Sequence, residues 1–202
     1  MEYIAHLSKD RKFKKLIEGR DPFTLTRRKH IHLYLCGSIM SQQLSTKVAA
    51  VIHKRFLDLF DRKTPTPHQI LAVAPGQLRA IGLSNAKTGY VHNVAKFAIE
   101  KGIDYKKLNK LSNEEVISYL TEIKGVGRWT AEMMLMFALG REDVFAIDDL
   151  GIQQAMIRLY KLDNSNKKEF RESMQKLSAR WSPYRTYACL HLWHWKDNKP
   201  VG

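Results

Sequence analysis

The sequence predicts an all-α protein. Apolar residues recur at helical spacing through most of the 202-residue chain, and the alternating runs typical of strands are missing. Two helix N-termini can also be predicted from capping patterns in the sequence. Thr66 is followed by Pro67 and then by Gln69, and Ser112 is followed by Glu115 three positions later, which is the capping-box pattern.

The elements that matter most lie in the second half of the chain. A helix is predicted from Ser112 to about Glu122, and Lys124-Gly125-Val126-Gly127 then forms a hairpin. A second helix, apolar on nearly every side and therefore central, follows from Arg128 to about Leu139, where Gly140 ends it. Another helix runs from Leu150 to about Tyr160, and segments 20–26 and 61–67 are the most loop-like.

Charge indicates the partner. Lys and Arg exceed Asp and Glu by 34 to 20, a net charge of +14 with a pI near 9.8, which favours a polyanion such as nucleic acid. No membrane association is expected, because the longest apolar stretch, Met133–Leu139, is far below the roughly 20 residues of a spanning helix. The N-terminus lacks the pattern of a signal peptide, so we expect a cytoplasmic, DNA-associated protein of bacterial type.

The hairpin between the two helices has the chemistry of a phosphate grip. Gly125 and Gly127 let a backbone approach closely, and the unpaired N–H groups at the start of the next helix favour an anion. A tight interhelical turn with no ligand would need the same glycines, so the hairpin alone leaves both interpretations open.

Two neighbouring acids, Asp148 and Asp149, precede the helix that begins at Leu150. A helix N-cap explains one of them and leaves the other unexplained. Together with the hairpin, with Ser38-Ile39-Met40-Ser41-Gln42-Gln43-Leu44-Ser45 and with the late Pro183–Ala188 and His191–Trp193 segments, they resemble the helix-hairpin-helix (HhH-GPD) DNA glycosylases. Trp129-Thr130-Ala131 and the same two late segments make the alkylated-base branch, DNA-3-methyladenine glycosylase II in its compact form, the most similar. The resemblance covers about residues 31–195.

The resemblance implies a two-lobed helical fold with the active site between the lobes. One lobe would comprise residues 1–40 and 128–202, the other residues 41–127 with the hairpin at 123–128, all within a single domain. It implies a monomer that acts on damaged double-stranded DNA. Its activity would be monofunctional base excision repair, in which an alkylated purine such as 3-methyladenine or 7-methylguanine is flipped out and excised hydrolytically, leaving an abasic site.

When the family's motifs are matched to this sequence residue by residue, the family's essential aspartate falls on Asp149. The resemblance implies that its carboxylate stabilises positive charge developing on the sugar. Asp148 would then be the cap or a structural neighbour. Gln43 falls on the position that plugs the gap left by the flipped base. The flipped base would contact Trp129, Trp193, Tyr187 and Met133, for which core packing is the alternative interpretation. The DNA-binding residues implied are Gln43, Lys124, Gly125, Val126, Gly127, Arg128 and Thr130.

Departures from the family pattern narrow the expected activity. Trp129 occupies the position of the Schiff-base lysine of bifunctional members, and Lys124 replaces a usual proline, which would place a point charge next to DNA. Cys189 alone cannot support the four-cysteine iron–sulfur cluster, so no cofactor is expected to be required. The resemblance also implies a structural Na⁺ or K⁺ on the carbonyls of Thr121, Ile123 and Val126. A non-catalytic DNA-binding module and an oxidised-guanine glycosylase are the alternatives.

Overall fold

The computed structural model describes residues 1–198, and within that range every regular element is a helix and none is a strand. The all-α prediction is therefore confirmed. The helices are α1 (Glu2–Leu7), α2 (Arg11–Ile17), α3 (Ile31–Ser41), α4 (Thr46–Asp58), α5 (Pro67–Ala72), α6 (Pro75–Ala80), α7 (Asn85–Glu100), α8 (Tyr105–Leu108), α9 (Asn113–Thr121), α10 (Arg128–Phe137), α11 (Leu150–Tyr160), α12 (Lys167–Ala179) and α13 (Arg185–Asp197). None of them is both long and apolar enough to cross a membrane.

The helix boundaries read from the sequence hold. Thr66 and Ser112 each form a complete capping box, with Gln69 and Glu115 as the respective partners. Helix α10 buries its residues from Thr130 to Met136, as expected of a helix that is apolar on nearly every side. Gly140 follows it with a φ of 66°, a left-handed conformation that suits glycine after a helix end.

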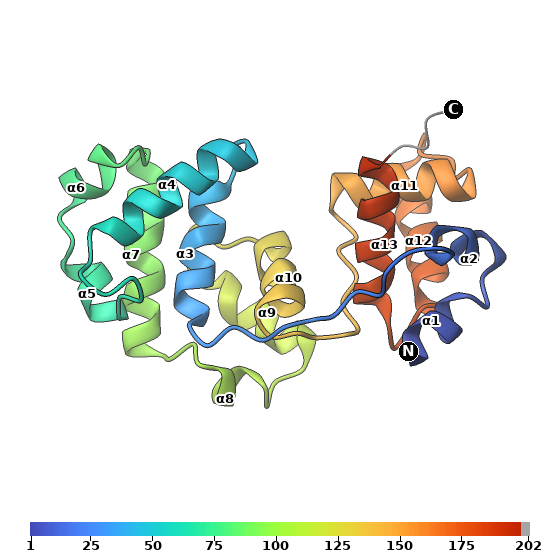
Figure 1. Ribbon diagram of the computed structural model, residues 1–202, viewed down its shortest axis with the longest axis horizontal. Coiled ribbons are helices and arrows are strands. Elements are labelled where there is room, and N and C mark those ends of the chain that lie inside the picture. The colour runs from blue at the N-terminus through green and yellow to red at the C-terminus, as the bar shows by residue number, and fades with distance from the viewer. Residues whose placement is uncertain (199–202) are drawn as a thin grey trace. The chain divides into compact units, whose positions relative to one another are not determined.

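The chain folds as two compact units. A continuous unit comprises Arg27–Leu139, and a discontinuous unit combines Met1–Thr26 with the chain from Gly140 onward. In the continuous unit α3 packs against α4, α7 and α10, and α9 packs against α10. In the discontinuous unit α13 packs against α2 and α11, so helices from both ends of the sequence meet there (Figure 1).

These boundaries differ from the expected lobes, 1–40 with 128–202 and 41–127. Helices α3 and α10 fall wholly in the continuous unit, because their packing partners are α4, α7 and α9. The two ends of this unit are joined directly, since the amide of Arg28 donates to the carbonyl of Ala138 at 2.8 Å. The observed units differ from the expected lobes because a helical periodicity marks an apolar face without indicating which helix that face packs against.

Each unit has its own aromatic or aliphatic core. Trp181 and Phe13, both almost completely buried, lie 5.0 Å apart between ring centroids in the discontinuous unit. The core of the continuous unit is formed by buried residues that include Leu35, Ile39, Val91 and Met134. Cys36 is buried in the continuous unit, and Cys189 is buried in the discontinuous unit.

Candidate active site and nucleic-acid interface

Asp149 is held in a fixed orientation in the discontinuous unit. It is the N-cap of α11, and its Oδ1 accepts the amide of Ile152 at 2.9 Å. The same oxygen accepts the indole N–H of Trp193, from α13, at 2.8 Å. Asp149, not Asp148, is therefore the cap of this helix, and its carboxylate is also hydrogen-bonded to one of the expected pocket tryptophans.

Gly151 makes room for this pair. A Cβ placed on Gly151 would lie 3.0 Å from Asp149 Oδ1 and 3.1 Å from Cδ1 of the Trp193 indole. Such contacts are tighter than ordinary packing, so the missing side chain is what allows carboxylate and indole to approach. The sequence carries one signal of this arrangement, because Gly151 lies in the first turn of the helix that follows the acid pair.

Asp148 has a different environment from its neighbour. It is exposed and forms an ion pair with Arg171 of α12, which offers two guanidinium nitrogens to its carboxylate. An exposed pair of this kind contributes little to stability, but it balances the negative charge next to Asp149. The surface ion pair therefore accounts for Asp148, the acid that does not cap the helix.

Tyr187 lies in the same unit as Asp149. Its ring stacks on Tyr3 with centroids 4.0 Å apart, and its hydroxyl donates to Glu142 Oε1 at 2.9 Å. Burial and this hydrogen bond to a carboxylate raise the pKa of the Tyr187 hydroxyl. Stacking on Tyr3 buries the side chain to 8% exposure, so in this structure its ring serves packing.

The hairpin in the continuous unit has two glycines with unlike roles. Gly125 has a φ of 107°, and a Cβ there would lie 2.3 Å from Cγ of Tyr90, so no other residue fits. Gly127 is the N-cap of α10, and a Cβ on it would meet nothing within 4 Å. The protein's own packing therefore requires Gly125 but leaves the surface at Gly127 open to an external group.

Two basic residues flank the hairpin, and they differ in whether their charged groups are paired with acidic side chains of the protein. Lys124 is exposed, and its carbonyl accepts a hydrogen bond from Asn93 at 3.1 Å. Arg128 donates from Nε to Glu132 at 3.0 Å and from Nη1 to Glu114 at 3.0 Å, and Nη2 also pairs with Glu114. The Arg128 guanidinium holds the pKa of Glu114 below its usual value. Arg128, expected as a DNA contact, is thus engaged within the protein, where it joins α9 to α10.

A cavity of about 1300 Å³ lies beside α3 in the continuous unit. Trp129, 43% exposed, lines it together with Met133 and Thr130, so the structure brings these three expected residues together. Gln43 and Gly127 also line it. An open cavity with an exposed indole on its wall is the kind of site that can accept a planar, apolar ligand.

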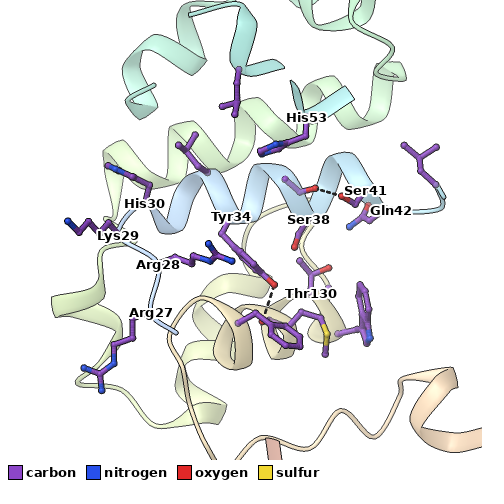
Figure 2. A pocket seen from close by; sticks show the side chains of 18 of the residues that line it. Arg27, Arg28, Lys29, His30, Tyr34, Ser38, Ser41, Gln42, His53 and Thr130 are labelled. Carbon is purple, nitrogen blue, oxygen red and sulfur yellow. Dashed lines mark hydrogen bonds between the residues drawn. The ribbon is translucent and has the colours of Figure 1, made fainter. Parts of the chain in front are cut away.

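Figure 2 shows how this cavity is built along α3. Tyr34 points toward α10, where its hydroxyl donates to the carbonyl of Met133 at 3.3 Å, and Ser38 follows one turn later. Near the start of α3 the lining is basic, and near its end it includes serine and glutamine side chains. The basic residues are Arg27, Arg28, Lys29 and His30, and the lining at the other end includes Ser41 and Gln42. Sequence reasoning did not single out Tyr34, Ser38 or the basic 27–29 run as part of one site.

The turn after α3 carries Gln43. This residue is exposed and has a φ of 58°, a left-handed conformation that is uncommon for a side chain other than glycine, asparagine or aspartate. Its neighbour Gln42 donates from Nε2 to the carbonyl of Gly125 at 3.3 Å. The segment with the expected plug residue is therefore attached to the hairpin.

The residues expected to hold a cation lie at the same hairpin. The carbonyl of Ile123 accepts the amide of Val126 at 2.9 Å, which closes the turn. Within residues 1–198 no group of three or more His, Cys, Asp or Glu side chains is arranged to hold a metal ion. A cation at this place would depend on backbone oxygens.

Residues 36–181 match the family described as "HhH-GPD superfamily base excision DNA repair protein". The chain belongs to the HhH-GPD superfamily. A relative named DNA-3-methyladenine glycosylase 1, from Schizosaccharomyces pombe, is 36% identical over 181 residues, covering 89% of this chain and 78% of the relative.

Two solved structures of the HhH-GPD type are similar over nearly the whole chain. The S. pombe 3-methyladenine DNA glycosylase in complex with abasic DNA has a TM-score of 0.82 at 34% identity, covering 96% of this chain and 95% of the other. A DNA-3-methyladenine glycosidase from Bacillus halodurans has a TM-score of 0.83 at 32% identity, covering 95% and 87%. The all-α HhH-GPD fold expected from the sequence is confirmed.

Proposed function

We propose that this protein is a monofunctional DNA glycosylase that removes alkylated purines from double-stranded DNA and leaves an abasic site. The observation that carries the proposal is the fixed carboxylate of Asp149, held by a helix amide and by an indole N–H. It occurs in a chain that is similar over most of its length to proteins named for 3-methyladenine excision.

Asp149 supplies the chemistry at the sugar. Cleavage of an N-glycosidic bond develops oxocarbenium character, and a preorganised negative charge stabilises it without reorientation during the reaction. Two donors on one oxygen, from Ile152 and Trp193, keep the carboxylate in a single orientation. Water then attacks C1′, and the purine leaves with the bonding electrons.

The continuous unit supplies binding. The open backbone at Gly127 and the start of α10 suit a phosphate, and Lys124 adds an exposed positive charge. Gln43 fills the space left by the flipped nucleotide. The cavity walled by Trp129 and Met133 offers a face on which the flipped base stacks, and a cationic alkylated purine is additionally attracted to the indole.

The reaction needs neither an iron–sulfur cluster nor a redox cofactor. Trp129 stands where an imine-forming lysine would be required for strand cleavage, so the product is an intact strand with an abasic site. A structural Na⁺ or K⁺ at the carbonyls of Thr121, Ile123 and Val126 remains part of this proposal, as do a monomeric state and a bacterial-type cytoplasmic location.

The proposal is tested by incubating the protein with DNA treated with a methylating agent and identifying released bases by mass spectrometry. We expect 3-methyladenine and 7-methylguanine, and strand breaks only after alkali. Asp149→Asn should lower release by about 100-fold or more while DNA affinity is kept, and Asp148→Asn should change it little. Binding without release would favour a non-catalytic module, and release of oxidised guanine alone would favour the other alternative.

A further inference from the structure

One face of α7 presents Lys87, Tyr90 and Asn93, three residues spaced three apart along the helix. Each of them contacts one of two segments that are distant in sequence. Lys87 contacts the end of α3 and the turn that carries Gln43, whereas Tyr90 and Asn93 contact the hairpin. All of these residues belong to the continuous unit.

Lys87 caps the end of α3. Its Nζ donates to the carbonyl of Met40 at 3.0 Å and to the carbonyl of Gln42 at 2.6 Å. Carbonyls at a helix C-terminus have no partner within the helix, and a cation placed there also meets the negative end of the helix dipole. Two of its three ammonium protons are thus used inside the protein, so Lys87 differs from the many solvent-facing lysines of this basic chain.

The other two residues of this face fix the hairpin. The ring of Tyr90 lies so close to Gly125 that a Cβ on the glycine would overlap it. Asn93 donates from Nδ2 to the carbonyl of Lys124 at 3.1 Å. The hydrogen bond from Gln42 to the carbonyl of Gly125 then joins turn and hairpin directly.

Gln43 shows why such a support is needed. It follows directly after the residue whose carbonyl Lys87 binds, and it holds a left-handed backbone conformation. That conformation is unfavourable for a residue with a Cβ, so it persists only where neighbouring contacts determine it. The bonds to Gln42, one to its carbonyl and one from its side chain, supply those contacts.

We infer that Lys87 is a positioning residue that fixes the Gln43 turn relative to the phosphate-binding hairpin, so that insertion of Gln43 into the duplex and the grip on the strand backbone occur together. The inference rests on the proposed glycosylase function. Lys87 acts through the turn, not on the substrate or on a phosphate.

The test compares one lesion in two contexts. Single-turnover release of 7-methylguanine is measured from a duplex in which the lesion faces cytosine and from one in which it faces an abasic analogue, where flipping costs less. Lys87→Met should lower release from the paired lesion by about tenfold or more and from the unpaired lesion by no more than about threefold. Lys87→Arg, which retains donors for both carbonyls, should restore most of the loss.

Lys96→Met is the matched control, because Lys96 lies on the same helix, is exposed and forms a surface ion pair with Glu100. It should leave the ratio between the two substrates unchanged. Equal losses on both substrates in Lys87→Met, or no loss, would overturn the inference. So would a weaker affinity with a salt slope reduced by about 1, since that result identifies a phosphate contact.

Amide hydrogen exchange of the free protein gives a readout independent of activity. Lys87→Met should speed exchange over residues 41–46, and Lys96→Met should not. If the wild-type protein releases no base from either duplex, the proposed function fails, and exchange still decides whether Lys87 holds the turn. If Lys87→Met does not fold, Asn93→Ala loosens the hairpin end of the same face and should also depress release from the paired lesion selectively.

Discussion

The indole N–H of Trp193 and the amide of Ile152 converge on the same oxygen of Asp149, Oδ1, at 2.8 and 2.9 Å. Asp149 and Trp193 are 44 residues apart in the sequence. Asp149 is the N-cap of α11, and Trp193 lies in α13. A helix cap alone would orient the carboxylate from one side. The second donor comes from a large, half-buried ring, which makes the orientation depend on the packing of α13 against α11.

Replacing Trp193 with Phe keeps an aromatic ring and removes the N–H donor. We expect the rate of the chemical step to fall by about tenfold, because a hydrogen bond to a charged group contributes roughly 1.5–3 kcal/mol. Binding of undamaged DNA should not change. Single-turnover kinetics separate the two effects, and a variant that loses DNA affinity but keeps the rate would show that the ring matters and the N–H does not.

Gly151→Ala introduces a methyl group against Asp149 Oδ1 and the Trp193 indole. The excision rate should fall by about tenfold, because a catalytic group displaced by a fraction of an ångström is less effective, and the melting temperature should hardly change. Gly89→Ala is the control, since it lies in α7 with no atom within 4 Å of the added Cβ. That control should raise stability by about 0.5–1 kcal/mol and leave the rate unchanged.

The two hairpin glycines should give opposite results when changed to alanine. Gly125→Ala forces a clash with Tyr90 at a positive φ, so we expect clear destabilisation in thermal melts. Gly127→Ala should melt like the wild type, but DNA affinity measured by fluorescence anisotropy should fall, because the methyl group occupies the open face of the hairpin. Unchanged affinity in Gly127→Ala would place the phosphate elsewhere.

Substitutions of Lys124 and of Arg128 should have different effects on the salt dependence of DNA binding. Lys124→Met is expected to lower the slope of log affinity against log salt by about 1, as the loss of one phosphate contact does. Arg128→Gln should leave that slope nearly unchanged and reduce the melting temperature, because Arg128 joins Glu114 to the buried Glu132. A lower slope in Arg128→Gln would mean that DNA displaces the glutamates.

Acid should destabilise the protein through His191. Burial lowers the pKa of this imidazole from 6.5 to about 4, with Arg20 and His194 adding smaller effects in the same direction. The unfolded chain therefore takes up the proton first, so this contribution to stability is present above pH 6.5 and is lost as the pH falls toward 4. Urea unfolding at pH 7.5 and at pH 5 should show a smaller loss for His191→Gln than for the wild type.

Local features of this fold were readable from the sequence because their causes are local. The capping boxes at Thr66 and Ser112 depend on residues three positions apart, and the helix after the hairpin depends on one apolar run. The assignment of α3 and α10 to a unit depends on contacts between distant helices, and there the division seen in the structure differs from the expected lobes. Family resemblance, not periodicity, supplied Asp149.

The side-chain environment of the site was the least accessible to sequence reasoning. Arg128 was expected to contact DNA from its place beside the hairpin, although Glu132 four residues later already indicated an ion pair within the helix. Glu114, 14 residues earlier, gave no such signal. Lys87 is one of 34 Lys and Arg residues, and only the structure distinguishes an ammonium group on two carbonyls from one in solvent.

The hydrogen bond between Arg28 and Ala138 has a consequence for how the protein is made. Because it joins the two ends of the continuous unit, everything that unit requires has been synthesised once Leu139 leaves the ribosome. Residues 1–26 cannot complete their packing at that stage, since Phe13 packs on Trp181 and α2 packs on α13. The apolar side chains that residues 1–26 bury in the finished fold, Phe13 among them, therefore stay without their partners until α12 and α13 have been synthesised.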